Sequence, residues 1–171
     1  MRDTQRMIKT YEMHVPASPE RVFPLLCPVR ERDWLPYWNC EIICSTSGVA
    51  EPECVFTTDI PGRGKMIWVV TRYELPQLIQ YTVFKPESHT WNLSIRIIPE
   101  ASEFCRLTWQ HVFTGLTDSG NRYLRQYTDD HHRDHLRRIE RHLIHFLRTG
   151  KMLQDDLANN GMQADARTSR R

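Results

Sequence analysis

The middle of the chain alternates apolar and polar residues, a pattern typical of β-strands that are buried on one face. The clearest example is segment 104–114, in which Leu107 and Trp109 alternate with Arg106 and Thr108. Glycines and prolines separate the alternating segments by connections short enough for hairpins, so we expect an antiparallel meander. The predicted strands are Thr10–Val15, Trp38–Ser45, Cys54–Ile60, Lys65–Glu74, Leu78–Phe84, Thr90–Ile98 and Phe104–Thr114.

Two short helices are predicted between the first and second strands. The sequence Ser18-Pro19-Glu20 is typical of a helix start, with an N-cap, a proline at the first helical position and an acidic residue in the first turn. Pro24 and Pro28 keep this helix short, because proline removes a helical hydrogen bond. A second helical piece is expected over Val29–Leu35, so the segment predicts a broken helix.

One long helix is predicted near the end of the chain. The segment Asn121–Arg148 contains no glycine or proline, and its apolar residues recur at helical spacing. These residues are Leu136, Ile139, Leu143 and Leu147. The helix would be about 40 Å long, enough to cover the apolar face of a whole sheet. Gly150 is expected to end it.

The chain has 171 residues, which suits one domain and a tail. We assign residues 10–150 to the domain and residues 1–9 to an N-terminal lead-in. Residues 151–171 are polar and carry too few apolar residues to fold, so we predict a disordered C-terminal tail.

Charge and cysteine content narrow the class of protein. The formal net charge is only +2, so no strong overall field attracts nucleic acid or a membrane surface, and we predict no nucleic-acid partner. No apolar run is long enough for a membrane span, and the N-terminus lacks the apolar stretch of a signal peptide. Five cysteines, an odd number, fit a reducing compartment. We therefore expect a soluble cytoplasmic protein.

The order of these elements, together with several short motifs, resembles the SRPBCC superfamily. The matching segments are Ala17–Phe23, Trp34–Trp38, Trp68–Tyr73 with Pro76, Leu107–Trp109 and Thr114–Leu116. The superfamily has the START-related or helix-grip fold, and includes birch-pollen-allergen-like proteins and polyketide cyclases. The resemblance covers roughly residues 9–149. It implies an α+β fold, with a sheet curved around the long helix and a cavity between them for an apolar or amphipathic small molecule.

Aromatic and polar residues on the inner sheet face and at the cavity mouth are the candidate ligand contacts. The inner-face candidates are Tyr11, Trp91, Trp109, His111 and Phe113. The candidates at the mouth are Tyr37, Trp38, Arg72, Tyr73 and Tyr81. The inner-face side chains could instead fill the core and leave at most a small void. Arg72 lies on a strand with apolar residues on both faces, so it points either inward to an anionic partner or outward to solvent.

His111 is the candidate for chemistry. Strand alternation places it among Leu107, Trp109 and Phe113, and apolar surroundings lower the pKa of an imidazole and keep it neutral. A cyclase or dehydratase would use it as a base, with a tyrosine or arginine to stabilise an enolate. Alternatively, His111 is a core histidine that bonds to the backbone or to a side chain of the long helix.

Other motifs give weaker predictions. His131 and His135 lie four apart on a helix and could share a cation with a third ligand, but neighbouring arginines would repel it, so we predict no metal and no cofactor. Cys40 and Cys44 are best explained as small core residues. The turn Gly62–Lys65 offers backbone amides and two cations to an anion, although a hairpin turn explains its glycines equally well.

These observations predict a protein that binds a small hydrophobic or aromatic molecule between sheet and helix, as a carrier or cyclase-like protein. One alternative is a cyclase or dehydratase enzyme with His111 as base. The other is a ligand-free interaction module, in which exposed aromatics around Trp34–Trp38 bind a protein partner or a second copy. The sequence leaves a homodimer open.

Overall fold

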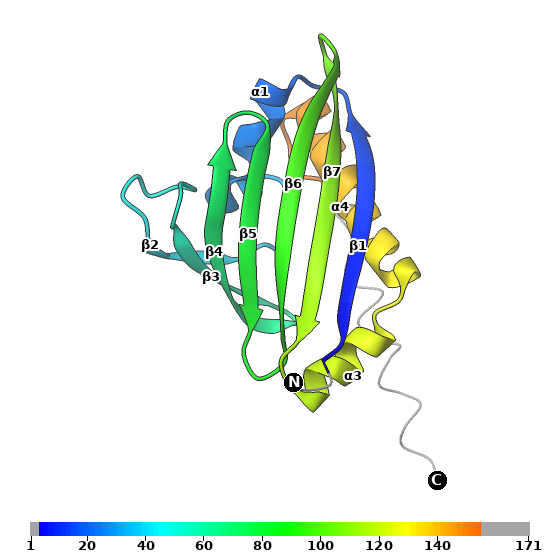
Figure 1. Cartoon of the computed structure of the whole chain (residues 1–171). Coiled ribbons are helices and arrows are strands. Elements are labelled where there is room, and N and C mark those ends of the chain that lie inside the picture. The colour runs from blue at the N-terminus through cyan, green and yellow to red at the C-terminus, as the bar shows by residue number, and fades with distance from the viewer. Residues whose placement is uncertain (1–3, 155–171) are drawn as a thin grey trace.

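The computed structural model describes residues 4–154 and contains a seven-stranded antiparallel sheet in the order β1-β7-β6-β5-β4-β3-β2 (Figure 1). The first and last strands in the sequence pair at one side, and the rest form a meander, as predicted. The strands are β1 (Arg6–Val15), β2 (Cys40–Cys44), β3 (Val55–Ile60), β4 (Gly64–Glu74), β5 (Leu78–Lys85), β6 (His89–Ala101) and β7 (Phe104–Gly115).

The first strand is longer than the sequence predicts. It begins at Arg6 and not at Thr10, because β7 supplies pairing partners as far as Thr114, which lies opposite Arg6. Residues 6–9 are therefore part of the sheet, and the predicted lead-in of residues 1–9 ends too late. Most of the predicted tail, residues 155–171, lies outside the described residues.

Three short helical segments connect β1 to β2: α1 (Pro19–Val22), the 3-10 helix η1 (Phe23–Leu26) and α2 (Pro28–Glu31). Two indoles tie the following loop to them. Trp34 Nε1 donates to the carbonyl of Leu25 at 2.9 Å, and Trp38 Nε1 donates to the carbonyl of Pro28 at 2.8 Å. This broken helical segment agrees with the prediction, except that its last helix ends at Glu31.

The predicted long helix is two helices, α3 (Asp118–Gln126) and α4 (Asp129–Thr149). They separate at Tyr127 and Thr128. The Thr128 hydroxyl accepts a hydrogen bond from the backbone N–H of His131 at 3.2 Å, so a new helix begins there without any glycine or proline. α4 ends as predicted at Gly150, which has a left-handed φ of 67°.

The core lies between one face of the curved sheet and α4. Leu136, Ile139 and Leu143 of α4 are buried, as their spacing predicts. Figure 1 shows α4 behind the sheet, while the sheet face toward the viewer carries no helix among the described residues. This is the α+β helix-grip arrangement. Of the helices within residues 4–154, none combines the length and apolar character needed to cross a bilayer.

Candidate functional site

A cavity of about 470 Å³ lies between the concave face of the sheet and α4. Its volume falls in the range of small-molecule sites, roughly 300–1,000 Å³. Seven of the ten candidate residues line it. They are Tyr37, Trp38, Tyr81, Trp91, Trp109, His111 and Phe113.

The other three candidates lie elsewhere. The Tyr11 hydroxyl donates to Glu140 at 2.6 Å, and burial together with that carboxylate raises the pKa of Tyr11 to about 12. Arg72 is half-exposed and its Nε lies 2.6 Å from Glu74, so it points outward. Tyr73 packs edge-on against Phe23.

An irregularity in strand pairing explains why the direction of Arg72 was ambiguous in the sequence. The register between β4 and β5 shifts between Val70 and Arg72, so the alternation of inward and outward residues changes phase there. Met66, Trp68 and Val70 are buried before the shift, and Arg72 is exposed after it.

Five rings from the sheet and the preceding loop form an aromatic wall, defined as Trp38, Phe56, Trp68, Tyr81 and Trp91. Trp68 is its centre. Its ring stacks on Phe56 with centroids 5.5 Å apart and meets Trp38, Tyr81 and Trp91 edge-on at 5.7, 5.8 and 5.7 Å. These contacts fix the ring of Trp68, so the apolar surface of the cavity is largely pre-formed.

His111 lies on the cavity wall and also contacts α4. Its Nδ1 is 3.2 Å from Nε2 of His132, and its ring stacks on Phe113. Burial, with smaller contributions from His132 and Arg63, lowers the pKa of His111 to about 3. The imidazole is therefore neutral at neutral pH, as expected from its surroundings. A group with so low a pKa is a weak general base, although it can still exchange hydrogen bonds.

The mouth of the cavity is cationic. Arg63, in the exposed turn between β3 and β4, places its terminal nitrogens 3.4 and 3.3 Å from Nε2 and Nδ1 of His135 on α4. Lys85, at the end of β5, donates to the carbonyl oxygen of Arg63. Burial and the Arg63 charge hold the pKa of His135 well below its usual value. The turn Gly62–Lys65 thus carries a cation to the cavity entrance.

Helix α3 completes the mouth through two close contacts. The ring of Tyr123 stacks on His89 with centroids 4.6 Å apart. At Gly120, an added Cβ would lie 1.8 Å from the carbonyl oxygen of Ser88, so the helix rests directly on the β5–β6 turn. Burial, assisted by Lys85, lowers the pKa of His89 to about 4. This side of the mouth is therefore built from neutral rings.

Of the described residues that line the cavity, one is acidic. Glu31, the last residue of α2, is only 8% exposed and lines the cavity. Its carboxyl group makes no hydrogen bond or ion pair with any residue from 4 to 154, and burial raises its pKa well above the ordinary value. The neighbouring Tyr81 hydroxyl donates instead to the carbonyl of Leu26 at 2.7 Å. Glu31 is thus available to a ligand.

The histidines of α4 do not form a metal site with one another. His131 is exposed, whereas His135 contacts Arg63. Within the part of the chain that the structure describes, no group of three or more His, Cys, Asp or Glu side chains could hold a metal ion.

Two further sequence hypotheses concern Cys40, Cys44 and the segment Trp34–Trp38. Cys40 is buried, but Cys44 is exposed beyond a bulge in β2, so only Cys40 fills the core as predicted. Trp34 is fully buried, and Tyr37 and Trp38 line the cavity. Trp34 is therefore excluded as an exposed contact, but Tyr37 and Trp38 are half-buried, and the hypothesis of a protein partner at this segment stays a prediction.

Three residues of the site were missed by the sequence analysis: His89 and Glu31, which line the cavity, and His132, which contacts His111. His89 continues the alternation of Trp91 and Leu93 by one step, so a longer predicted strand would have found it. Glu31 and His132 had no such signal. Glu31 follows a proline in a four-residue helix, and His132 sits among polar residues whose inward face depends on where α4 begins.

Comparisons with known proteins agree on the fold. The solved structures that align with this chain include a Thalictrum flavum norcoclaurine synthase in complex with a transition state analogue, at TM-score 0.64 and 13% identity over 86% of this chain and 97% of that chain. An uncharacterised protein from Rhizobium leguminosarum aligns at TM-score 0.63 and 14% identity over 86% and 98%. Ara h 8.0201 aligns at TM-score 0.60 and 14% identity over 84% and 98%.

At the level of sequence, a search of curated proteins gives no match. The family profile described as polyketide cyclase / dehydrase and lipid transport, in contrast, matches residues 8–143, which is most of the chain and includes the seven strands except for the first two residues of β1. This match shows that the chain belongs to the polyketide cyclase / dehydrase and lipid transport family, within the SRPBCC superfamily, and the cavity between sheet and helix agrees with it.

Proposed function

We propose that this protein binds a small hydrophobic or aromatic molecule in the cavity between the sheet and α4, as a carrier or cyclase-like protein. The observation that carries the proposal is the cavity itself, about 470 Å³ in volume and lined by the aromatic wall. A core filled by its own side chains would leave few voids larger than a water molecule. The family match supports the same function.

The proposed contacts are the seven candidate residues that line the cavity. Their aromatic faces would bury the body of the ligand, and His111 would exchange a hydrogen bond with a polar group. The enzyme alternative, with His111 as base, is second, because burial lowers the pKa of His111 to about 3 and makes it a weak base. The free state of all five cysteines supports a cytoplasmic location as part of the proposal.

Native mass spectrometry of freshly purified protein, compared with the denatured mass, tests this function directly. We expect an additional organic mass, or, after delipidation, saturable binding of tryptophol by calorimetry. The variant Ile139→Trp places an indole in the cavity from α4 and should abolish that binding. Ile8→Trp makes the same change at a position that is 63% exposed on β1, and should bind as the wild type does.

A bare native mass combined with no tryptophol binding would contradict the proposal and favour a protein without a small-molecule ligand. Equal binding by Ile139→Trp and wild type would place any ligand outside this cavity. The native mass also reports whether the protein forms a homodimer, which the sequence leaves open.

A further inference from the structure

A hydrophobic ligand leaves one feature of the cavity unexplained, the carboxyl group of Glu31. The side chain is 92% buried, given its 8% exposure, yet it has no hydrogen-bond or ion-pair partner within residues 4–154. Burying an unpaired carboxyl group costs free energy, since the group gives up its hydration and gains nothing in return. A glutamine or an apolar residue would serve a purely structural purpose better at this position.

The surroundings of Glu31 favour a positive charge. Glu31 and Tyr81 line the same cavity, and burial, with a smaller contribution from the charge of Glu31, raises the pKa of Tyr81. Tyr81 belongs to the aromatic wall, whose ring faces are electron-rich and attract cations. A cation beside Glu31 would therefore meet a carboxylate and aromatic faces together.

The nearby cations of the protein are engaged with other groups. Arg32, next to Glu31 in the sequence, donates to the carbonyl oxygen of Cys40 and does not line the cavity. Lys85 is four residues beyond Tyr81 on β5, a separation of about 13 Å along a strand. Its ammonium group donates to the Arg63 carbonyl, and the Arg63 guanidinium contacts His135. The two cationic side chains are thus engaged at the mouth, while the carboxyl group of Glu31 is open to a ligand.

We propose that the ligand is an amphipathic amine, with its apolar body against the aromatic wall and its ammonium group beside Glu31. This inference rests on the proposed function, because it requires the cavity to be occupied. It adds the chemical class of the ligand. Binding of the ammonium form releases to solvent any proton held by the buried carboxyl group, and the resulting carboxylate accepts a charge-assisted hydrogen bond from the ammonium group.

Two probes with the same ring and arm separate this class from a neutral one. Tryptamine and tryptophol differ only in an ammonium group against a hydroxyl group. We expect calorimetry to show tryptamine binding about tenfold or more tightly than tryptophol, as a desolvated charged pair requires. Indoleacetate, which carries the opposite charge, should bind most weakly of the three.

The variant Glu31→Gln keeps the shape of the side chain and removes its charge. It should reduce the affinity for tryptamine to that for tryptophol and leave tryptophol binding unchanged. Glu41→Gln, an exposed position on β2, is the matched control and should keep the full preference for the amine. We expect Glu31→Gln to melt at or above the wild-type temperature at neutral pH, which establishes that any loss of binding is not unfolding.

The outcomes separate the two proposals. If tryptophol binds as tightly as tryptamine, or if Glu31→Gln keeps the preference, the amine proposal is overturned while the cavity function stands. Preferred binding of indoleacetate would also overturn it and would assign the cationic mouth as the determinant. Absence of binding by all three probes would overturn the amine proposal, and together with a bare native mass it would overturn the cavity function as well.

Discussion

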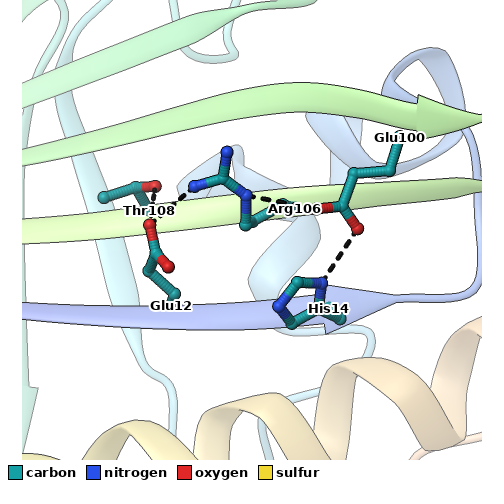
Figure 2. Close-up of polar contacts among 5 residues, drawn as sticks. All are labelled: Glu12, His14, Glu100, Arg106 and Thr108. Atoms are coloured by element: carbon teal, nitrogen blue, oxygen red, sulfur yellow. Dashed lines mark hydrogen bonds and ion pairs between the residues drawn. The ribbon is translucent and has the colours of Figure 1, made fainter.

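The two faces of strand β7 show how one alternating sequence creates two different environments. Trp109 and His111 point to the concave face, where they are buried against the cavity and α4. Arg106 and Thr108 point to the convex face (Figure 2), where Arg106 lies 2.7 Å from Glu12 and 3.2 Å from Glu100. Adjacent residues of the same strand therefore differ in whether a charge can be tolerated.

In the cavity, burial disfavours the charged forms of His111 and Glu31, whereas on the convex face Arg106 is paired with Glu12 and Glu100. The pKa of His111 falls and that of Glu31 rises, in both cases because burial disfavours the charged form. Glu100 shows the opposite, since its hydrogen bonds to His14 and Arg106 hold the pKa of its carboxyl below the usual value. Burial therefore distinguishes His111 and Glu31, which face the cavity, from Glu100, which is exposed and paired with neighbours on the convex face.

The largest expected difference between the faces concerns aromatic side chains. Trp68→Ala should reduce the free energy of unfolding by about 3–5 kcal/mol, because it leaves a cavity at the centre of the aromatic wall. Phe84→Ala removes a ring that is 40% exposed on β5 and should cost less than about 1.5 kcal/mol. Urea denaturation of both variants measures the two values. Similar losses would mean that the convex ring is as well packed as the concave one.

The next largest loss of stability is expected where α3 packs against the β5–β6 turn at the cavity mouth. Gly120→Ala should destabilise the protein by about 1–3 kcal/mol, because the new Cβ would overlap the Ser88 carbonyl and push α3 from the β5–β6 turn. The stacking of Tyr123 on His89 should weaken with it, and tryptophol should dissociate faster. Arg125→Ala, at an exposed position on α3, is the control that leaves the contact with the β5–β6 turn in place. Unchanged dissociation from Gly120→Ala would show that α3 does not close the mouth.

Much of this fold could be predicted from the sequence, because alternation and turn residues act locally. Strand β7, with its regular inward set, was predicted to within one residue. Strand β1 was not, since its first four residues are held by pairing with β7, which is a long-range contact. The break at Thr128 was also missed, because a threonine N-cap inside a run without glycine or proline is a weak signal.

The site was less predictable than the fold. Inward residues of regular strands, such as Trp91 and Phe113, follow from parity. Arg72 does not, because a register shift precedes it. Arg63 and Glu31 reach the cavity from a turn and a four-residue helix, where no periodicity exists to indicate direction. Chain topology, and not local pattern, brings them to the same cavity.

Acid titration should reveal the concave face through His111. The unfolded chain takes up a proton near the ordinary imidazole pKa of about 6.5, whereas folded His111 resists protonation down to about pH 3. The unfolded state therefore binds more protons over this range, so the stability contributed by neutral His111 is present above pH 6.5 and is lost as the pH falls. For one such group, the free energy of unfolding should fall by about 2 kcal/mol between pH 7 and pH 5.

Denaturation of His111→Gln at the two pH values measures this contribution. Over the same pH interval, the free energy of unfolding of the variant should fall by about 2 kcal/mol less than that of the wild type. Burial also lowers the pKa of His132, so part of the slope should persist in the variant. His131→Gln changes an exposed residue on the same helix as His132 and serves as the matched control. A variant slope equal to that of the wild type would mean that His111 is not neutral by burial.

The smallest effect is expected for the ion pairs of the convex face. Arg106→Gln removes contacts to Glu12 and Glu100, but these carboxylates are 50% and 37% exposed and water replaces the lost charge. Exposed pairs contribute about 0–1 kcal/mol, and we expect a loss in that range at low salt. Because salt screens exposed charges, the difference between variant and wild type should shrink towards zero in about 1 M sodium chloride. A salt-independent loss above about 2 kcal/mol would show that Arg106 is held in a low-dielectric setting, and the contrast between the two faces would then reflect side-chain shape more than exposure to water.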